Sequence, residues 1–200
     1  MTVDDIDLFD LYSCFPVAVF NVRDGLGVAA NDSRPLTVTG GLPYFGGAGN
    51  NYSMHGIASM MRRLRAEPRA RGLVAANGGY LSKYSVGVYS ARPSEWRGFS
   101  SEALQAEIDA WPAPAIVPGV GEGLIETYTI DYAPETPVGI VVARVIEGGG
   151  RFVAMTDPED GTLVKQMIAA DPLGAAVTVE QNAAGRAVIV SFRPASGRRA

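Results

Sequence analysis

The sequence has very little cysteine and histidine. One cysteine, Cys14, and one histidine, His55, occur in 200 residues. A single cysteine forms no internal disulfide bond, and together with one histidine it is too few for a zinc site built from these two residue types. We therefore predict no metal site, and any chemistry has to come from oxygen and nitrogen side chains or from a bound organic group.

Long hydrophobic runs and excess basic charge are also absent. No apolar run approaches the ~20 residues that span a bilayer. Residues 1–10 carry four aspartates, where a signal peptide needs basic residues and an apolar core. The net charge is −4 and neither half of the chain is strongly basic, so nucleic acid and membrane phosphates are not the expected partners. These features predict a cytoplasmic globular protein that binds neither nucleic acid nor membrane.

The first half of the chain alternates between strand and helix patterns. Residues 7–12 and 36–39 predict strands, the apolar stretch 14–20 predicts a helix, and residues 52–65 have apolar residues at helical spacing. Two further strands, 72–76 and 85–89, are joined through Asn77-Gly78-Gly79, whose glycines permit positive φ. This order, β-α-β-α-β-β, predicts a layered α-β-α fold with a mixed sheet.

The second half has a different pattern. A proline-rich linker over 93–120 contains one short helix at 101–110, and it precedes three strands, a helix and two strands. The predicted strands are 123–132, 138–147, 151–156, 175–181 and 186–192, with the helix at 163–170. Five strands with a helix between the third and fourth predict a small OB-like β-barrel. The predicted domains are 1–92, 93–120 as linker, 121–194 as barrel and 195–200 as a frayed tail.

Three further features have a structural and a functional interpretation. The glycine-rich loop before the helix at residue 52 is either a tight turn or an anion site at the helix N-terminus. The arginines between 62 and 71 are either the solvated side of the helix or a docking face for phosphates or an acidic partner. Tyr80 near Lys83 could act as an acid with a lowered pKa, or both could simply be solvated hairpin residues.

Three short motifs resemble the active-site motifs of the second catalytic half of thiolases. Tyr12-Ser13-Cys14-Phe15 is found where thiolases have Asn-Glu-Ala-Phe or His-Asp-Cys-Phe. Gly46-Gly47-Ala48 is found in place of Gly-His-Pro, and Ala76-Asn77-Gly78 in place of Cys-x-Gly. The stretches 39–47 and 77–83 are similar to the thiolase-like protein type 1 group of mycobacteria and related bacteria. That group has an extra C-terminal OB-like domain, so the resemblance covers nearly the whole chain.

The resemblance implies an altered site. In the family, side chains of the first two motifs hold the thioester oxygen and the cysteine of the third moves a proton, but Gly47 and Ala76 can do neither. The remaining catalytic candidates are Tyr12, Tyr80 and His55. A loop near coenzyme A would comprise Gly46, Gly47, Asn50, Asn51 and Ser53. Cys14 occupies a packing position of its motif, and the nucleophilic cysteine of thiolases belongs to the other half.

Three functions follow from the resemblance. The first is the C-terminal portion of a thiolase-like, acyl-CoA-associated protein of the acyltransferase family, inactive as a thiolase by itself and requiring no cofactor, with coenzyme A or acyl-CoA as its ligand. The second is one half of a split enzyme of altered carbon–carbon chemistry, with Tyr12 or Tyr80 as acid. The third is a docking module in lipid metabolism. The expected partner is a thiolase N-terminal half, in the same or a separate chain, or a second copy.

Overall fold

The computed structural model describes residues 1–95 and 98–193. The chain divides into two compact units, Met1–Phe99 and Ser100–Ala200, and each is described by itself. The domain bounds expected from the sequence remain a prediction, and the tail 195–200 lies outside the described residues.

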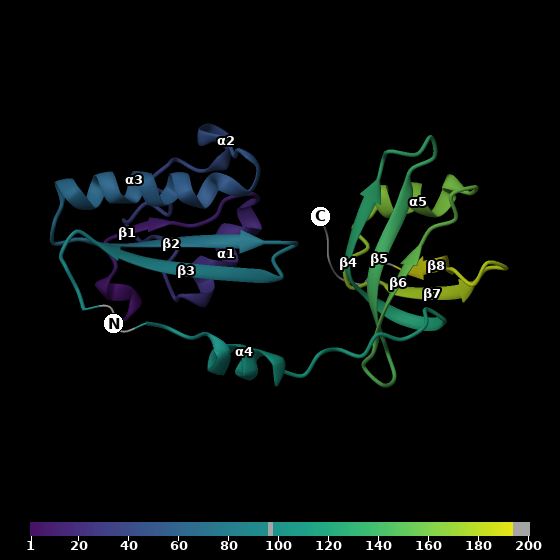
Figure 1. Ribbon diagram of the computed structural model, residues 1–200. Coiled ribbons are helices and arrows are strands. Elements are labelled where there is room, and N and C mark those ends of the chain that lie inside the picture. The colour runs from purple at the N-terminus through teal and green to yellow at the C-terminus, as the bar shows by residue number, and fades with distance from the viewer. Residues whose placement is uncertain (96–97, 194–200) are drawn as a thin grey trace. The chain divides into compact units, whose positions relative to one another are not determined.

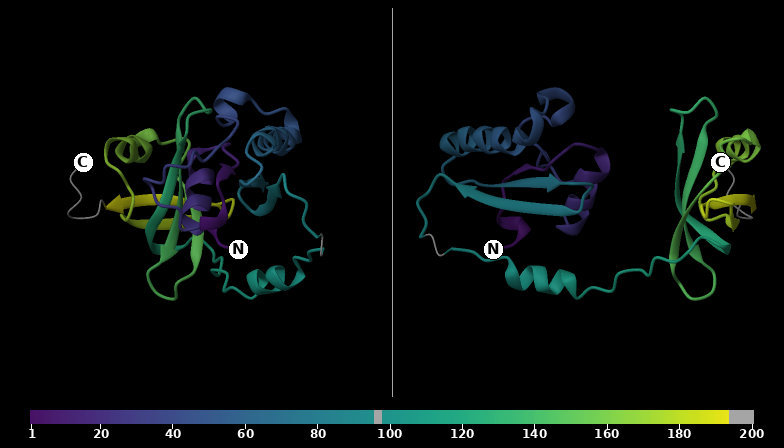
Figure 2. Two further views of the ribbon diagram at one scale, coloured as in Figure 1. Left: turned by 90° about the vertical axis from the view of Figure 1, so that its left-hand side faces the viewer. Right: turned by 45° about the vertical axis from the view of Figure 1, so that its right-hand side comes forward.

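The first unit is built on a mixed three-stranded sheet. Strands β1 (Leu8–Asp10), β2 (Arg71–Gly78) and β3 (Lys83–Ser90) lie in the order β1-β2-β3, with β1 parallel and β3 antiparallel to β2 (Figure 1). Helices α1 (Pro16–Gly25) and α3 (Tyr52–Ala66) pack on the sheet, and the short 3-10 helix η1 (Val3–Asp5) precedes β1. Figure 2 shows α3 running along one side of the sheet. The predicted layered α/β fold is confirmed.

Each face of the sheet has its own apolar core, because side chains alternate along a strand. On one face, Phe9 and Leu73 pack with Val19 and Val22 of α1. On the other face, Val74 packs with residues of α3 that include Met60 and Leu64. A Cβ atom at Gly72 would lie only 2.1 Å from the sulfur of Met60, so β2 and α3 are in close contact there.

The strand predicted at residues 36–39 is wrong. This segment is irregular, and only its first carbonyl, that of Leu36, accepts a hydrogen bond from the backbone of Leu11. The N–H groups of Val38 and Thr39 instead donate to the buried carboxylate of Asp10. A side chain therefore satisfies the donors that a neighbouring strand would otherwise satisfy, and apolar alternation alone does not reveal this.

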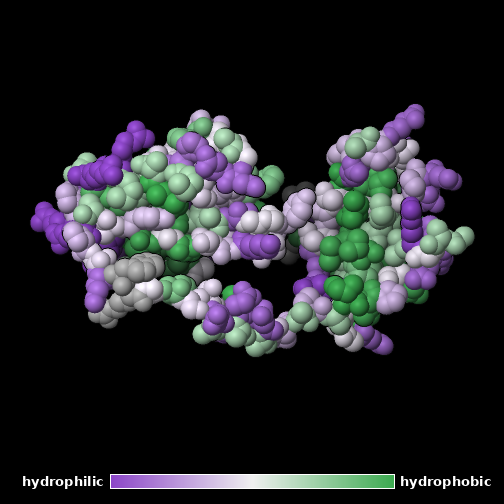
Figure 3. Space-filling model, viewed as in Figure 1, coloured by the Kyte–Doolittle hydropathy of each residue, from purple (hydrophilic) through white to green (hydrophobic). Residues whose placement is uncertain are grey.

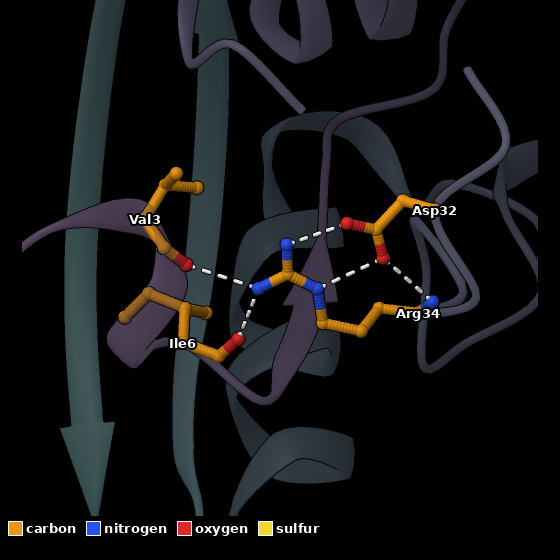
Figure 4. Close-up of polar contacts among 4 residues, drawn as sticks. All are labelled: Val3, Ile6, Asp32 and Arg34. Atoms are coloured by element: carbon orange, nitrogen blue, oxygen red, sulfur yellow. Dashed lines mark hydrogen bonds and ion pairs between the residues drawn. The ribbon is translucent and has the colours of Figure 1, made fainter. Parts of the chain in front are cut away.

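An arginine connects the irregular segment to the start of the chain. Figure 4 shows that the guanidinium of Arg34 donates to both carboxylate oxygens of Asp32 and to the carbonyl oxygens of Val3 and Ile6. It also lies over the ring of Phe9, 4.9 Å from the ring centre. Arg34 holds the pKa of Asp32 well below its usual range, at about 2.

The glycine-rich loop contains two short helical turns, α2 (Leu42–Phe45) and η2 (Gly49–Asn51). Gly41 and Gly46 flank α2 with φ of +90° and +83°, which side chains rarely adopt. In the later hairpin only Gly79 of the predicted glycine pair has positive φ, at +61°. Leu81 has the same φ although it carries a side chain. The hairpin therefore turns at residues 79–82, two residues later than the sequence suggested.

The second unit is a closed barrel with the strand order β4-β5-β6-β8-β7. After helix α4 (Glu102–Asp109) come β4 (Gly121–Asp131), β5 (Val138–Val145), β6 (Arg151–Met155), helix α5 (Gly161–Ala169), β7 (Ala176–Gln181) and β8 (Ala187–Arg193). Helix α5 begins after Asp160, whose carboxylate accepts the N–H of Thr162. The predicted five-stranded barrel is confirmed, with β6 and β8 joined by a single residue pair.

The barrel is apolar inside and in part outside. Its core includes Val141 and Phe152, which are almost fully buried. Figure 3 shows hydrophobic residues also on the outer surface of the barrel. Val153 and Met155 of β6 are exposed, and they pair across the ladder with Val142 and Ile140.

Candidate functional site

A buried carboxylate organises the end of β1. Asp10 is fully buried and accepts hydrogen bonds from the N–H groups of Val38 and Thr39 at 2.9 and 3.0 Å and from the Thr39 hydroxyl at 3.0 Å. The hydroxyl of Tyr52, the first residue of α3, donates to the other carboxylate oxygen at 3.3 Å. Burial is the main cause that raises the pKa of Tyr52. Asp10 thus connects β1, the irregular segment and α3.

The first motif contacts the third directly and is linked to the second through Leu42. The Ser13 hydroxyl accepts the N–H of Leu42 at 3.0 Å, and the Leu42 side chain lies against Gly47, where a Cβ atom would be 3.3 Å away. The sulfur of Cys14 accepts a long, weak hydrogen bond of 3.9 Å from the Asn77 amide, next to Ala76. Ser13 and Cys14 therefore link the first motif to the other two, to the second through Leu42 and to the third, at the end of β2, directly.

Tyr12 and His55 belong to one row of aromatic rings. Tyr12 packs edge-on against Tyr52 with 5.5 Å between ring centres, and Tyr52 packs edge-on against Phe45. The His55 ring lies 5.5 Å from that of Phe45, and its Nε2 atom is 3.4 Å from the Asn51 amide. These two predicted catalytic residues share a layer, but at least two rings separate them, so they do not form an acid–base pair.

Tyr80 lies away from this group. It is fully exposed in the turn after Gly79, and the structure brings it to none of the other candidates. A different tyrosine lies beside the third motif: Tyr84 pairs with Asn77 across the hairpin. Burial raises the pKa of Tyr84 to about 12, and the nearby Cys14 thiol contributes. Tyr84 therefore remains a neutral hydrogen-bond donor over the physiological range.

Asn77 has an unsatisfied polar atom. Its Oδ1 is buried and has no hydrogen-bond partner, while its amide nitrogen reaches only the Cys14 sulfur. Buried acceptors without a partner are rare and unfavourable. A group carrying an N–H or O–H could satisfy this atom at the third motif.

The predicted cofactor loop is mainly exposed. Gly46, Gly47, Asn50 and Asn51 are open to solvent, and Ser53 is half-buried. Asn51 caps α3 by position, but its side chain makes no capping hydrogen bond. The first N–H groups of α3 therefore do not donate to the Asn51 side chain, and the loop remains a predicted site for a phosphate.

The described residues contain no group of three or more metal-ligating side chains. Within the same residues, no helix has the length and apolar character needed to cross a bilayer.

Sequence reasoning missed Asp10, Thr39, Tyr52 and Asn77. Asp10 follows two buried residues of β1, and an acidic residue within an apolar strand is a signal that could have been used. Tyr52 looked like an ordinary core residue at helical spacing. The unsatisfied amide of Asn77 carries no sequence signal, because it depends on the surrounding packing.

Two of three comparisons place the chain among known proteins. Residues 103–184 match the family model of the thiolase-like protein type 1 additional C-terminal domain. The chain resembles the crystal structure of a monomeric SCP2-thiolase-like protein type 1 from Mycobacterium smegmatis, with a TM-score of 0.85 and 48% sequence identity. This match covers 95% of the present chain and 41% of that chain. The search of curated proteins found no match.

The fold and the family match define a thiolase-like protein in which an α/β unit is followed by an OB-like barrel. The chain is a thiolase-like protein that carries the type 1 additional C-terminal domain. It spans 41% of the length of the related mycobacterial chain.

Proposed function

We propose that this chain is the C-terminal portion of an acyl-CoA-associated protein that lacks thiolase activity by itself. One observation carries the proposal: the three motif positions meet through Ser13 and Cys14, while Gly47 and Ala76 supply no titratable side chain. The scaffold of a thioester site is thus retained without its proton-transfer groups.

Covalent acyl transfer needs a nucleophile, a base beside it and donors for the oxyanion. The neighbours of Cys14 are an amide, Asn77, and a phenol with a raised pKa, Tyr84. His55, the only histidine of the chain, is in contact with Phe45 and Asn51 instead. The thiol therefore lacks the basic partner that an acyl-transfer nucleophile uses.

The ligand that we propose for the motif site is coenzyme A or its acyl thioester. Its pantetheine arm carries two amide N–H groups, and the unsatisfied Oδ1 of Asn77 is an acceptor for such a donor. The glycine loop at Gly46 and Gly47, the second motif, is open to solvent and could accommodate another part of the ligand. Both features favour binding and neither supplies catalysis.

The test combines an activity assay with binding. We expect no thiolysis of acetoacetyl-CoA by the purified chain, and we expect calorimetry to detect binding of phosphate-free pantetheine. Asn77→Ala should weaken pantetheine binding by about tenfold, because one buried hydrogen bond is lost. Asn21→Ala on the exposed face of α1 is the matched control. Ordinary thiolase turnover would overturn the claim of inactivity. Failure of pantetheine to bind would overturn the proposed ligand.

A second candidate function is half of a split enzyme, and an exposed apolar surface favours it. Val86 and Val88 of β3 are 53% and 43% exposed, and they lie on the sheet face that α1 only partly covers. Val17 and Phe20 of α1 are exposed too. β3 is also an edge of the three-stranded sheet. Exposed apolar strands at a sheet edge are typical of interaction sites.

The partner that we propose for this surface is a thiolase N-terminal half, in the same or a separate chain. The chain covers only 41% of the related mycobacterial protein, so that protein has a large further part which such a surface could contact. In this arrangement Tyr12 is the proposed acid, since Tyr80 lies apart from the motif positions.

Co-purification tests the partner. An N-terminal half from the related mycobacterial protein, expressed together with this chain, should co-elute with it, and Val86→Asp should abolish co-elution. Val153→Asp on the outer face of the barrel introduces the same charge at a similarly exposed valine and should have no effect. Separate elution of the two wild-type polypeptides would overturn the proposal. So would an equal loss of co-elution with Val86→Asp and with Val153→Asp.

A further inference from the structure

A basic cavity lies at the other end of the sheet from the motif positions. Its volume is about 650 Å³, and Arg69, Arg71, Val88, Ser90 and Arg92 are among the residues that line it. Arg71 begins β2 and pairs with Ser90, the last residue of β3. At a strand rise of ~3.3 Å per residue, Arg71 lies about 20 Å from Asn77. This cavity is therefore separate from the candidate site described above.

The strand register explains why three arginines meet here. Arg69 and Arg92 are each two residues beyond the Arg71–Ser90 pair, on its two sides. Arg69 lies in the turn before β2 and Arg92 in the bend after β3, so the pairing at this end of the hairpin brings arginines from both chain segments to one place. The other arginines of the sequence cluster, Arg62, Arg63 and Arg65, are exposed on α3 and do not line the cavity.

The positive charge of the cavity is poorly balanced. Arg71 has one long ion pair, 3.9 Å from its Nη1 atom to Asp5, and its backbone N–H donates to Asp7. Arg69 and Arg92 have no carboxylate partner within residues 1–95 and 98–193. Glu67, the nearest acidic residue in sequence to Arg69, is paired with Arg63. Like charges held together favour an anion between them.

We propose that this cavity binds a small organic phosphate. Guanidinium groups bind phosphate oxygens through two parallel hydrogen bonds, and Arg69 and Arg92 are free to do so. Val88 and Tyr89, which also line the cavity, offer a surface for the organic part of the ligand. The cavity volume falls in the range of small-molecule sites, about 300–1,000 Å³. A compact phosphate ester suits these features better than an extended macromolecule.

This inference does not depend on the proposed function. Pantetheine, which has no phosphate, tests the Asn77 site alone. ADP and pyrophosphate test the basic cavity, and variants of its arginines distinguish it from the predicted phosphate loop at residues 46–53. ADP is part of coenzyme A and of free nucleotides, so the two sources need separating. If coenzyme A displaces bound ADP and pantetheine does not, the cavity binds the phosphate groups of coenzyme A. Absence of displacement would assign it to another phosphate ester.

Calorimetric titration of the 200-residue chain is the test. We expect ADP and pyrophosphate to bind at low ionic strength, more weakly as salt is added, and adenosine not to bind. The double variant Arg69→Gln/Arg92→Gln should weaken ADP binding at least about tenfold. The control Arg62→Gln/Arg65→Gln makes the same change of net charge on α3 and should leave binding unchanged.

Two results would overturn the inference: no binding of ADP or pyrophosphate by the wild-type chain, and equal loss of affinity in both double variants. Thermal melting shows whether each variant is folded. If the cavity variant does not fold, amide chemical shifts of the wild-type chain give the answer. ADP should then shift Val88, Ser90 and Arg92 and leave Asn77 unmoved, and shifts confined to the motif end would contradict the proposal.

Discussion

The hydroxyl of Tyr52 donates a hydrogen bond to the carboxylate of Asp10, which lies 42 residues earlier in the chain. Through it, the first turn of α3 is fixed to the end of β1. Tyr12 follows two residues after Asp10 and packs against the Tyr52 ring. The position of the candidate site thus depends on a buried acidic residue that is not itself a candidate for catalysis.

Asp10→Asn should destabilise the first unit by about 2–4 kcal/mol. The substitution replaces one carboxylate oxygen by an NH2 group and removes the negative charge. The backbone N–H groups of Val38 and Thr39 therefore lose their charged acceptor, because an NH2 group is itself a donor. Amide hydrogen exchange at these two residues and urea unfolding measure the effect. Asp24→Asn, at an exposed carboxylate paired with its neighbour Arg23, is the control and should change stability by less than about 0.5 kcal/mol. Equal effects would contradict the assignment.

Gly41→Ala should cost more stability than Gly47→Ala. Gly41 has φ +90°, and its new Cβ atom would lie 3.1 Å from the Ser13 hydroxyl. Backbone strain of this kind costs about 1–2 kcal/mol. Gly47 has no such φ, and its Cβ atom would meet only the end of the flexible Leu42 side chain at 3.3 Å. Thermal melting of both variants makes the comparison, and a larger loss for Gly47→Ala would show that the loop differs from the one described.

Tyr84 should ionise only at strongly alkaline pH. Its pKa is raised from 10.0 to about 12, chiefly by burial. The folded state therefore holds this proton more tightly than the unfolded state, so the stabilising contribution is complete below pH 10 and is lost as the pH rises toward 12. The difference between ultraviolet titrations of the wild type and Tyr84→Phe should show the group. Cys14→Ala should lower this pKa only slightly, because the thiol is the smaller cause.

Asp32 should make stability depend on pH in acid. Its pKa falls from 3.8 to about 2 through hydrogen bonds from Arg34, so its contribution is complete above pH 3.8 and is lost as the pH falls toward 2. Asp32→Asn and Arg34→Gln should each flatten this part of the stability curve, and the double variant should match either single variant. An unchanged acid slope in Arg34→Gln would refute the pairing shown in Figure 4.

Regular elements with a clear hydrophobic period could be predicted from the sequence. The bounds of the helix at 52–65 and of the strands around residues 74 and 87 were predicted to within about two residues. This was possible because the spacing of apolar residues follows the faces of an element that are buried. The barrel was predictable for a related reason, since its strands and one helix follow a recognisable order. Residues 36–39 misled the prediction because their alternation reflects contacts with the Asp10 carboxylate and the core, not a strand ladder.

The candidate site was predictable only in part. The motif positions at 12–15, 46–48 and 76–78 were located through the family resemblance, and the structure brings them together. The role of Tyr84 was not predictable, because the register of the hairpin decides which tyrosine lies beside Asn77. Local sequence near Ala76 favoured Tyr80, which the turn instead directs into solvent.

Gly72 and Met60 also set a limit on how this protein can change during evolution. Because a Cβ atom at position 72 would overlap the Met60 sulfur, the two positions share one volume between β2 and α3. A larger residue at 72 is tolerated only together with a smaller one at 60. Among homologous sequences the two positions should therefore covary, and this pairing would fix the register of helix on strand without any polar contact.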